Sequence, residues 1–345
     1  INIPIGILSL IMVSLFIKDP PYLRKIKAKI DYWGLAFIVL GIGSLQIVLD
    51  KGQREDWFSS VFIIRFALLA AISLILFIIV ELKAKDPVLN IRQLKNISFA
   101  SANAIQFFSF FGLFGSIVLL PLFVQQLLGY NAFLAGMVIA PGGLTTLLVM
   151  PIVGRLVTKI NPKAILFSGV ILLFFSMLMM AKFNLQIDYT IVLWSRIVMG
   201  MGMGMIFIPL TTMAFSTIHK EEMGNATSIF NLLRNIAGSF GIAFMTTVLA
   251  RRAQFHQLRL VETLTPFDYQ YQMAFKNMMS ALSAKTGIVS SQMANGFLYR
   301  QALRESSLYS FNDAFYVGAI AILCILPLIF LLRRPKHSNI PTALH

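Results

Sequence analysis

The sequence predicts an all-α protein that crosses a membrane several times. Hydrophobic residues make up 57% of the 345 residues and charged residues only 12%, which leaves too little polar surface for a soluble domain of this size. The apolar residues form long continuous runs, each close to or above the roughly 17–25 residues that a helix needs to cross a bilayer. Continuous runs favour helices over a β-barrel, because apolar and polar residues alternate with a period of two in the strands of a barrel.

Nine apolar runs follow one another along the chain, and we expect each to form a membrane-spanning helix. They are Ile1–Ile17, Trp33–Leu49, Ser60–Val80, Phe99–Leu127, Ala132–Val153, Ala164–Ala181, Tyr189–Phe215, Thr227–Leu249 and Ala314–Leu332. Ile1 lies inside an apolar run without a charged region before it. We therefore expect the chain to be the C-terminal part of a longer protein.

Alternate loops are rich in basic residues, which predicts the orientation in the membrane. One set of loops carries Lys18, Arg24, Lys25, Lys27, Lys29, Lys83, Lys85, Arg92, Lys95, Arg155, Lys159, Lys163, Lys220, Arg333, Arg334 and Lys336. The intervening short loops carry only Lys51, Arg54 and Lys182. Since basic loops stay in the cytoplasm, we expect the first set and the C-terminus there, and the long segment 250–308 outside.

The outer segment 250–308 contains three stretches with helical periodicity. These are Ala253–Thr263, Tyr271–Ser283 and Gln292–Ser306. We expect short amphipathic helices that lie along the membrane surface or cap the outer mouth of the protein.

Several classes of function are disfavoured. The net charge of +15 sits in loops where it sets orientation, so nucleic-acid binding is not expected. Motifs of metalloproteases and P-loop enzymes are absent, as is Cys/His metal spacing, so we expect neither an enzyme nor a metal site. A polytopic membrane enzyme would need a catalytic or metal cluster at a membrane face. The single cysteine, Cys324, reads as a packing residue.

Amide and aromatic side chains gather in the run Phe99–Leu127. Amides inside a span need a partner on another helix or a wet cavity. Such a lining suits flat, hydrophobic and often cationic molecules, whereas the alternative is lipid-facing Phe with amides that bridge helices. The candidate substrate-cavity residues are Asn103, Gln106, Phe107, Phe110 and Gln125.

Proline and glycine interrupt two later runs. Pro and Gly loosen a membrane helix and allow bending or close approach. The residues concerned are Pro141, Gly142, Gly200, Gly204 and Pro209. They predict helices that either move or pack tightly.

Polar residues within the spans are candidates for function. Asn231 and Arg234 lie in Thr227–Leu249, and a guanidinium there marks a functional or bridging position unless it snorkels to the headgroups. Arg65 and Arg196 lie shallower, and we expect both to snorkel. Acidic residues occur only at span borders, so we expect a proton-carrying group upstream of Ile1.

Two sets of motifs resemble a known family. Residues 154–163 read G-R-L-V-T-K-I-N-P-K and resemble the loop motif G-x-L-x-D-R-x-G-R-K of the major facilitator superfamily. Gly154, Arg155 and Lys159 fit, with Lys in place of Arg. The segment departs from the motif at Thr158, Asn161 and Pro162, so a charge relay through the missing Asp is not supported.

More specific motifs resemble the fourteen-span drug:proton antiporters of the EmrB/QacA type. They are I-N-I-P-I-G at 1–6, L-P-L-F-V-Q at 120–125, L-G-Y at 128–130, A-P-G at 140–142, G-N-A at 224–226 with Asn231, Arg234 and Gly238–Ser239, A-R-R-A-Q-F-H at 250–256 and N-D-A-F at 312–315. The resemblance implies nine of fourteen spans. Residues 1–17 would be the last span of the N-terminal half, 18–95 cytoplasmic loops and two linker spans, and 96–345 a C-terminal six-helix bundle.

The resemblance also implies a function. Such a protein exports amphipathic toxic compounds in exchange for protons by alternating access, with the proton gradient as energy source and no cofactor. Arg155 and Lys159 would act in gating. Implied partners are the lipid bilayer, a small amphipathic substrate, a missing N-terminal half and a periplasmic adaptor with an outer-membrane channel, in a bacterial inner membrane. The alternatives are an exporter of a specific metabolite or siderophore on the same scaffold, or a non-transporting remnant.

Overall fold

A computed structural model describes residues 2–16, 31–84, 87–262, 265, 267–286 and 291–332. The predicted cytoplasmic loop 18–30 and the basic residues of the C-terminal tail lie outside the described residues. Within these ranges the regular structure is entirely helical. The all-α prediction is therefore confirmed.

From α1 to α7 the helices follow the apolar runs closely, whereas α8 extends past its run and the last run is divided between α10 and α11. They are α1 (Asn2–Phe16), α2 (Tyr32–Lys51), α3 (Val61–Lys83), α4 (Ile97–Gln126), α5 (Ala132–Leu156), α6 (Pro162–Met180), α7 (Tyr189–Phe215), α8 (Met223–Glu262), α9 (Tyr269–Thr286), α10 (Ser291–Leu323) and α11 (Ile325–Leu331), with 3₁₀ turns at Trp57–Ser59, Ile91–Lys95 and Lys220–Glu222. Within the described residues, eight helical segments are long and apolar enough to cross a membrane. The first predicted span is a shorter apolar helix.

Local sequence sets where the helices begin. The side chain of Asn96 accepts from the backbone N–H groups of Ser98 and Phe99, and Asn131 and Asn161 cap α5 and α6 in the same way. Such caps satisfy donors that the first turn leaves free. Gly129, in the turn between α4 and α5, has a φ of 73°, a conformation that costs glycine little.

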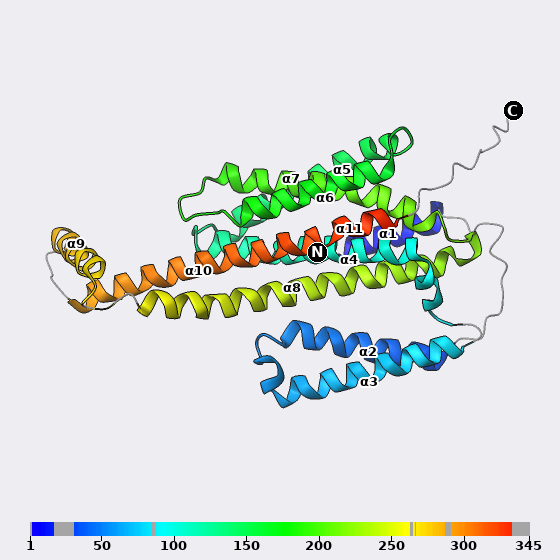
Figure 1. Ribbon diagram of the computed structural model, residues 1–345, viewed down its shortest axis with the longest axis horizontal. Coiled ribbons are helices and arrows are strands. Elements are labelled where there is room, and N and C mark those ends of the chain that lie inside the picture. Colours follow the sequence, from blue (N-terminus) through cyan, green and yellow to red (C-terminus); the bar gives the residue numbers. More distant parts are fainter. Residues whose placement is uncertain are drawn as a thin grey trace.

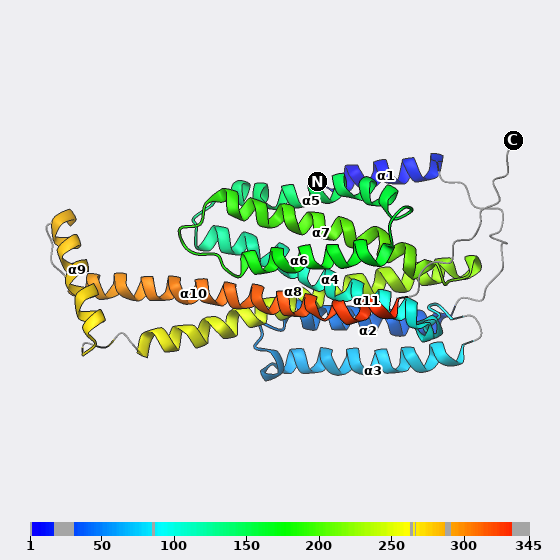
Figure 2. The same cartoon turned by 45° about the horizontal axis from the view of Figure 1, so that its top comes forward.

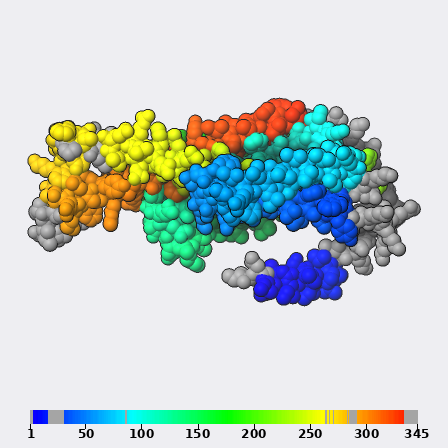
Figure 3. Space-filling view, turned by 90° about the horizontal axis from the view of Figure 1, so that it is seen from below, coloured from blue at the N-terminus to red at the C-terminus, as the bar shows by residue number. Residues whose placement is uncertain are grey.

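Helices α4 to α8, α10 and α11 form one bundle around a shared core. α5 packs on α7, α6 on α7, α4 on α8, and α8 on α10 (Figure 1). Near the end of α4, the ring of Phe123 contacts the rings of Phe183 and Phe311. Helices α2 and α3 form a hairpin beside α8, joined to it by a hydrogen bond of 2.6 Å from Ser239 Oγ to Gln46 Oε1. Figure 3 shows α1 as a separate body beside the rest.

The outer segment differs from the prediction. Ala253–Thr263 and Gln292–Ser306 are not separate short helices, because the first continues α8 and the second begins α10. The two helices extend together past the other loops, and α9 lies across their tip (Figure 2). Residues 249–262 contain no proline or glycine, so nothing stops the helix after the apolar run ends.

Candidate functional site: an apolar cavity between α4, α5 and α7

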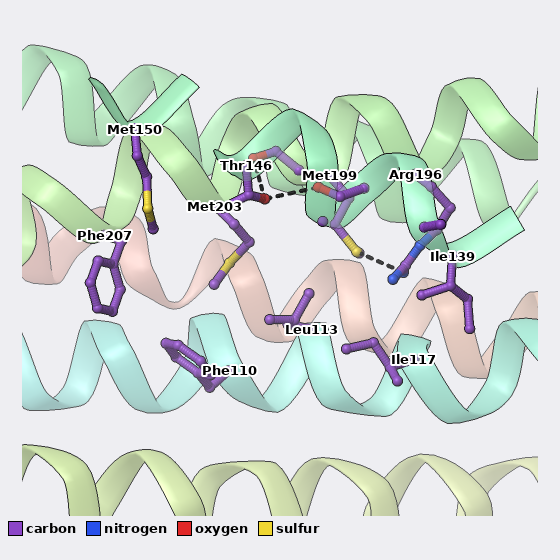
Figure 4. A pocket seen from close by; sticks show the side chains of 14 residues that line it. Phe110, Leu113, Ile117, Ile139, Thr146, Met150, Arg196, Met199, Met203 and Phe207 are labelled. Atoms are coloured by element: carbon purple, nitrogen blue, oxygen red, sulfur yellow. Dashed lines mark hydrogen bonds between the residues drawn. The ribbon is translucent and has the colours of Figure 1, made fainter. Parts of the chain in front are cut away.

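A cavity of about 420 Å³ lies between α4, α5 and α7 (Figure 4). Its lining is mostly aliphatic, aromatic and thioether side chains. The lining residues are Phe110, Leu113 and Ile117 of α4, Ile139, Ala140, Gly142, Gly143, Thr146 and Met150 of α5, and Arg196, Met199, Gly200, Met203 and Phe207 of α7. A concave, mostly apolar pocket with few polar groups is typical of a site for a small molecule.

Glycines bring α5 and α7 into backbone contact beside the cavity. A Cβ added to Gly200 would lie 2.1 Å from the carbonyl oxygen of Gly142, and one added to Gly142 would lie 3.0 Å from that of Arg196. The hydroxyl of Thr146 donates to the carbonyl oxygens of Gly142 and Gly200, each at 2.9 Å. Small residues and hydroxyl bonds are what close helix packing in lipid requires. The sequence left two roles open for Gly142 and Gly200, helix movement or tight packing. The structure shows tight packing for both.

The other helix-bending candidates lie in continuous helices. Pro141 is inside α5 and Pro209 inside α7, and both helices run through the prolines without a break. A Cβ on Gly204 would lie 2.9 Å from Cγ1 of Val149 on α5, so this glycine extends the same contact. A role in bending stays a prediction.

Arg196 lies inside the bundle, so the prediction that it snorkels is wrong. Only 2% of the surface of Arg196 is exposed. Its Nη1 donates to Ser116 Oγ at 3.0 Å and lies 3.0 Å from Met199 Sδ, while Nε is buried and has no hydrogen-bond partner. Figure 4 shows the guanidinium pointing from α7 into the space facing Ile117. The apolar residues around α7 gave no signal of which face turns inward.

The five predicted cavity residues are spread over four surroundings. Phe110 lines the cavity. Asn103 and Gln106 are buried; their amide groups donate to the carbonyl oxygens of Phe99 and Phe230, at 2.8 and 2.9 Å, so Gln106 bridges α4 to α8. Phe107 packs against the rings of Phe108 and Phe240. Gln125 is exposed near the end of α4.

Arg234 and Asn231 are half-buried on α8. For Arg234, the bridging prediction implies a carboxylate, an amide or a carbonyl as partner on a facing helix. The structure instead places its guanidinium carbon 5.7 Å from the ring centre of Phe110, a cation–π contact. Arg234 thus lies over the ring of a residue that lines the cavity.

The loop motif lies at the end of α5 away from the outer extension. Gly154 is half-buried in the last turns of α5, and Arg155 and Lys159 are exposed. The hydroxyl of Thr158 donates to the carbonyl oxygen of Arg155 at 2.8 Å. The structure therefore leaves both cations free to contact other helix ends, and their gating role stays a prediction.

The bundle and its cavity are those of a polytopic membrane protein, and comparison with known families gives the class. The model of the Major Facilitator Superfamily matches residues 1–242. The chain belongs to this superfamily.

Named relatives cover nearly all of the chain. It is 30% identical to the fatty acid resistance protein FarB of Neisseria gonorrhoeae, over 98% of this chain and 66% of that protein. It is 31% identical to the multidrug export protein EmrB of Escherichia coli, over 97% of this chain and 64% of that protein. The chain thus spans 64–66% of the length of these relatives.

A solved structure of a bacterial homolog of the human lysosomal transporter Spinster, inward-facing and occupied, aligns with 88% of this chain and 67% of that chain. The sequence identity is 13% and the TM-score 0.46.

Proposed function

We propose that this chain forms part of an exporter of amphipathic toxic compounds, driven by proton entry. The observation that carries the proposal is the cavity between α4, α5 and α7, with its apolar lining and buried guanidinium. The similarity to a multidrug export protein and to a fatty acid resistance protein supports the same class of cargo. A transporter of this kind is not an enzyme and uses the proton gradient in place of a cofactor.

The proposed transport cycle needs more than this bundle. Alternating access rocks two helical halves about a central site, so we propose that an N-terminal half completes the cavity and carries the proton-binding group. The protein would lie in a bacterial inner membrane with its C-terminus in the cytoplasm. The extension of α8 and α10, on the outer side in this orientation, would be placed to meet a periplasmic adaptor and an outer-membrane channel.

Transport can be tested with the natural full-length protein in vesicles. An imposed pH gradient should drive uptake of a fluorescent amphiphile into inside-out vesicles, and a protonophore should abolish it. A variant with Gly143→Trp, which fills the cavity from a position where an added Cβ meets nothing within 4 Å, should transport poorly while folding normally. Uptake that does not depend on the pH gradient would refute proton coupling. Unchanged uptake by the Gly143→Trp variant would refute the cavity as the transport route.

The orientation has its own test. Single cysteines at Lys95 and Phe267, both exposed, can be introduced in a Cys324→Ala background. An impermeant thiol reagent added to intact cells should label position 267 and spare position 95. Labelling of position 95 from outside would reverse the proposed topology.

A further inference from the structure

The cavity carries a positive charge at one end that no acidic side chain among the described residues balances. Arg196 is 2% exposed, and its Nε is buried without a hydrogen-bond partner. None of the residues that line the cavity is acidic. Among the described residues, the ion pairs that involve side chains lie elsewhere, where Arg252 and His256 meet Asp313. The partners of Arg196 are the neutral hydroxyl of Ser116 and the thioether of Met199.

A guanidinium in such a place is costly without a counter-charge. An isolated buried charge loses its hydration, and a neutral hydroxyl and a sulfur return only part of that loss. Arg196 lies seven residues after the start of α7 at Tyr189, about 10 Å along the helix axis, and its head points inward (Figure 4). Charged side chains that face a cavity inside a membrane mark the path of a substrate or ion.

The opposite end of the cavity is apolar. Phe207, Met150 and Met203 line it, and Phe207 lies about 16 Å from Arg196 along α7, at about 1.5 Å per residue. Figure 4 shows Arg196 and Phe207 at opposite ends of the space. Phe110 already has the cation of Arg234 near its ring, which weakens this aromatic as a site for a second cation.

We propose that the cavity binds amphipathic monoanions, with the carboxylate of the ligand paired to Arg196 and its apolar tail directed toward Phe207. A carboxylate matches the planar fork of a guanidinium and forms the strongest class of hydrogen bond available to it. This inference rests on the proposed export function and specifies its substrate class. An anionic ligand thus takes the place of the cationic ligand that the aromatic and amide residues of α4 suggested.

Three probes with the same tail separate charge from hydrophobicity: laurate, dodecanol and dodecyltrimethylammonium. Each competes with radiolabelled laurate on the purified full-length protein in lipid nanodiscs. Unlabelled laurate should compete about ten-fold or more better than either of the other two, the effect of one charge-assisted hydrogen-bonded pair. Arg196→Gln should remove this preference and leave the binding of dodecanol, measured directly with labelled alcohol, nearly unchanged.

Two further variants keep the test decisive. Arg65→Gln removes a cation of the same type from an exposed position on α3 and should preserve the preference for laurate. Arg196→Lys keeps the charge but lacks the fork, so it should retain the preference with weaker binding, even if Arg196→Gln does not fold. Equal competition by the three probes in the wild-type protein, or loss of the preference in Arg65→Gln, would overturn the inference.

The same probes distinguish this inference from the proposed function. Selective, Arg196-dependent binding of laurate without proton-driven efflux of any amphiphile would contradict the export function alone. Efflux of dodecyltrimethylammonium, without selective binding of laurate, would contradict the anion site alone.

Discussion

The contact between α5 and α7 predicts that Gly200→Ala is strongly destabilising. The added methyl group would lie 2.1 Å from the carbonyl oxygen of Gly142, whereas ordinary contacts begin at 3.4 Å. The helices would have to separate by about 1.3 Å at this point. Overpacking of this kind costs about 1–3 kcal/mol, and loss of the bond from Thr146 to Gly200 adds about 0.6–1.7 kcal/mol. After subtraction of the roughly 1 kcal/mol by which alanine favours a helix over glycine, we expect a net destabilisation of about 1–4 kcal/mol.

A graded series isolates the clash from the effect of glycine on helix formation. Alanine in place of glycine favours a helix by about 1 kcal/mol wherever it is placed in the interior. Gly143→Ala, which meets nothing within 4 Å, should be neutral or stabilising. Gly142→Ala, at 3.0 Å from the carbonyl oxygen of Arg196, should fall between Gly143→Ala and Gly200→Ala.

The measurement is unfolding of the purified protein in mixed detergent micelles, with increasing dodecyl sulfate and helicity as the signal. The midpoint should fall most for Gly200→Ala and least for Gly143→Ala. A Gly200→Ala protein that unfolds at the wild-type midpoint would show that α5 and α7 do not touch at this point. A Gly143→Ala protein that is as unstable as Gly200→Ala would show that the effect is not the clash.

Three other substitutions test separate parts of the structure. Arg155→Ala should lower transport several-fold and leave binding of the labelled ligand nearly unchanged, because Arg155 is exposed beyond the cavity; normal transport at normal expression would refute a gating role. Arg234→Lys should lower activity, since lysine lacks the planar group that lies over Phe110, while a fully active Arg234→Ala would show that the residue only snorkels. Asp313→Asn should speed trypsin cleavage near Arg252 by breaking the ion pair that joins α8 to α10; an unchanged cleavage rate would mean that packing alone holds these helices together.

The membrane helices could be predicted from the sequence because their signal is length and apolarity, which need no knowledge of neighbours. The faces that these helices turn toward the interior of the bundle could not be predicted from the sequence. α7 is apolar around its whole circumference, so periodicity does not show whether Arg196 turns toward lipid or toward α4. Counting residues from the helix end suggested snorkelling. Gly200 and Gly204, four residues apart and in line with Arg196, were the available clue, because glycines on one helix face mark a side where another helix approaches closely.

The extension of α8 and α10 was missed for a different reason. The sequence predicts helix ends at the membrane boundary, yet polar residues continue a helix as well as apolar ones do, and 249–262 of α8 contain neither proline nor glycine. The pairing that stabilises the extension joins residues far apart in sequence: Arg252 and His256 both contact Asp313, and Ser306 Oγ donates to the carbonyl oxygen of Ala253 at 2.9 Å. Such pairs cannot be read from one sequence.

The placement of Arg196 also suggests how binding and movement could be connected. The cavity lies between two closely packed helix pairs: α5 with α7, joined through Thr146 and Gly200, and α4 with α8, joined through Gln106. Ser116 of α4 links to α7 by two contacts: its hydroxyl oxygen accepts from Arg196, and its hydroxyl lies 3.3 Å from Sδ of Met199. An anion that binds Arg196 through Nη1 would compete with the Ser116 hydroxyl for that donor. Occupancy of the cavity would then weaken the polar link between the pairs while leaving each pair intact, and a ligand with this differential effect can shift one arrangement of helices toward another.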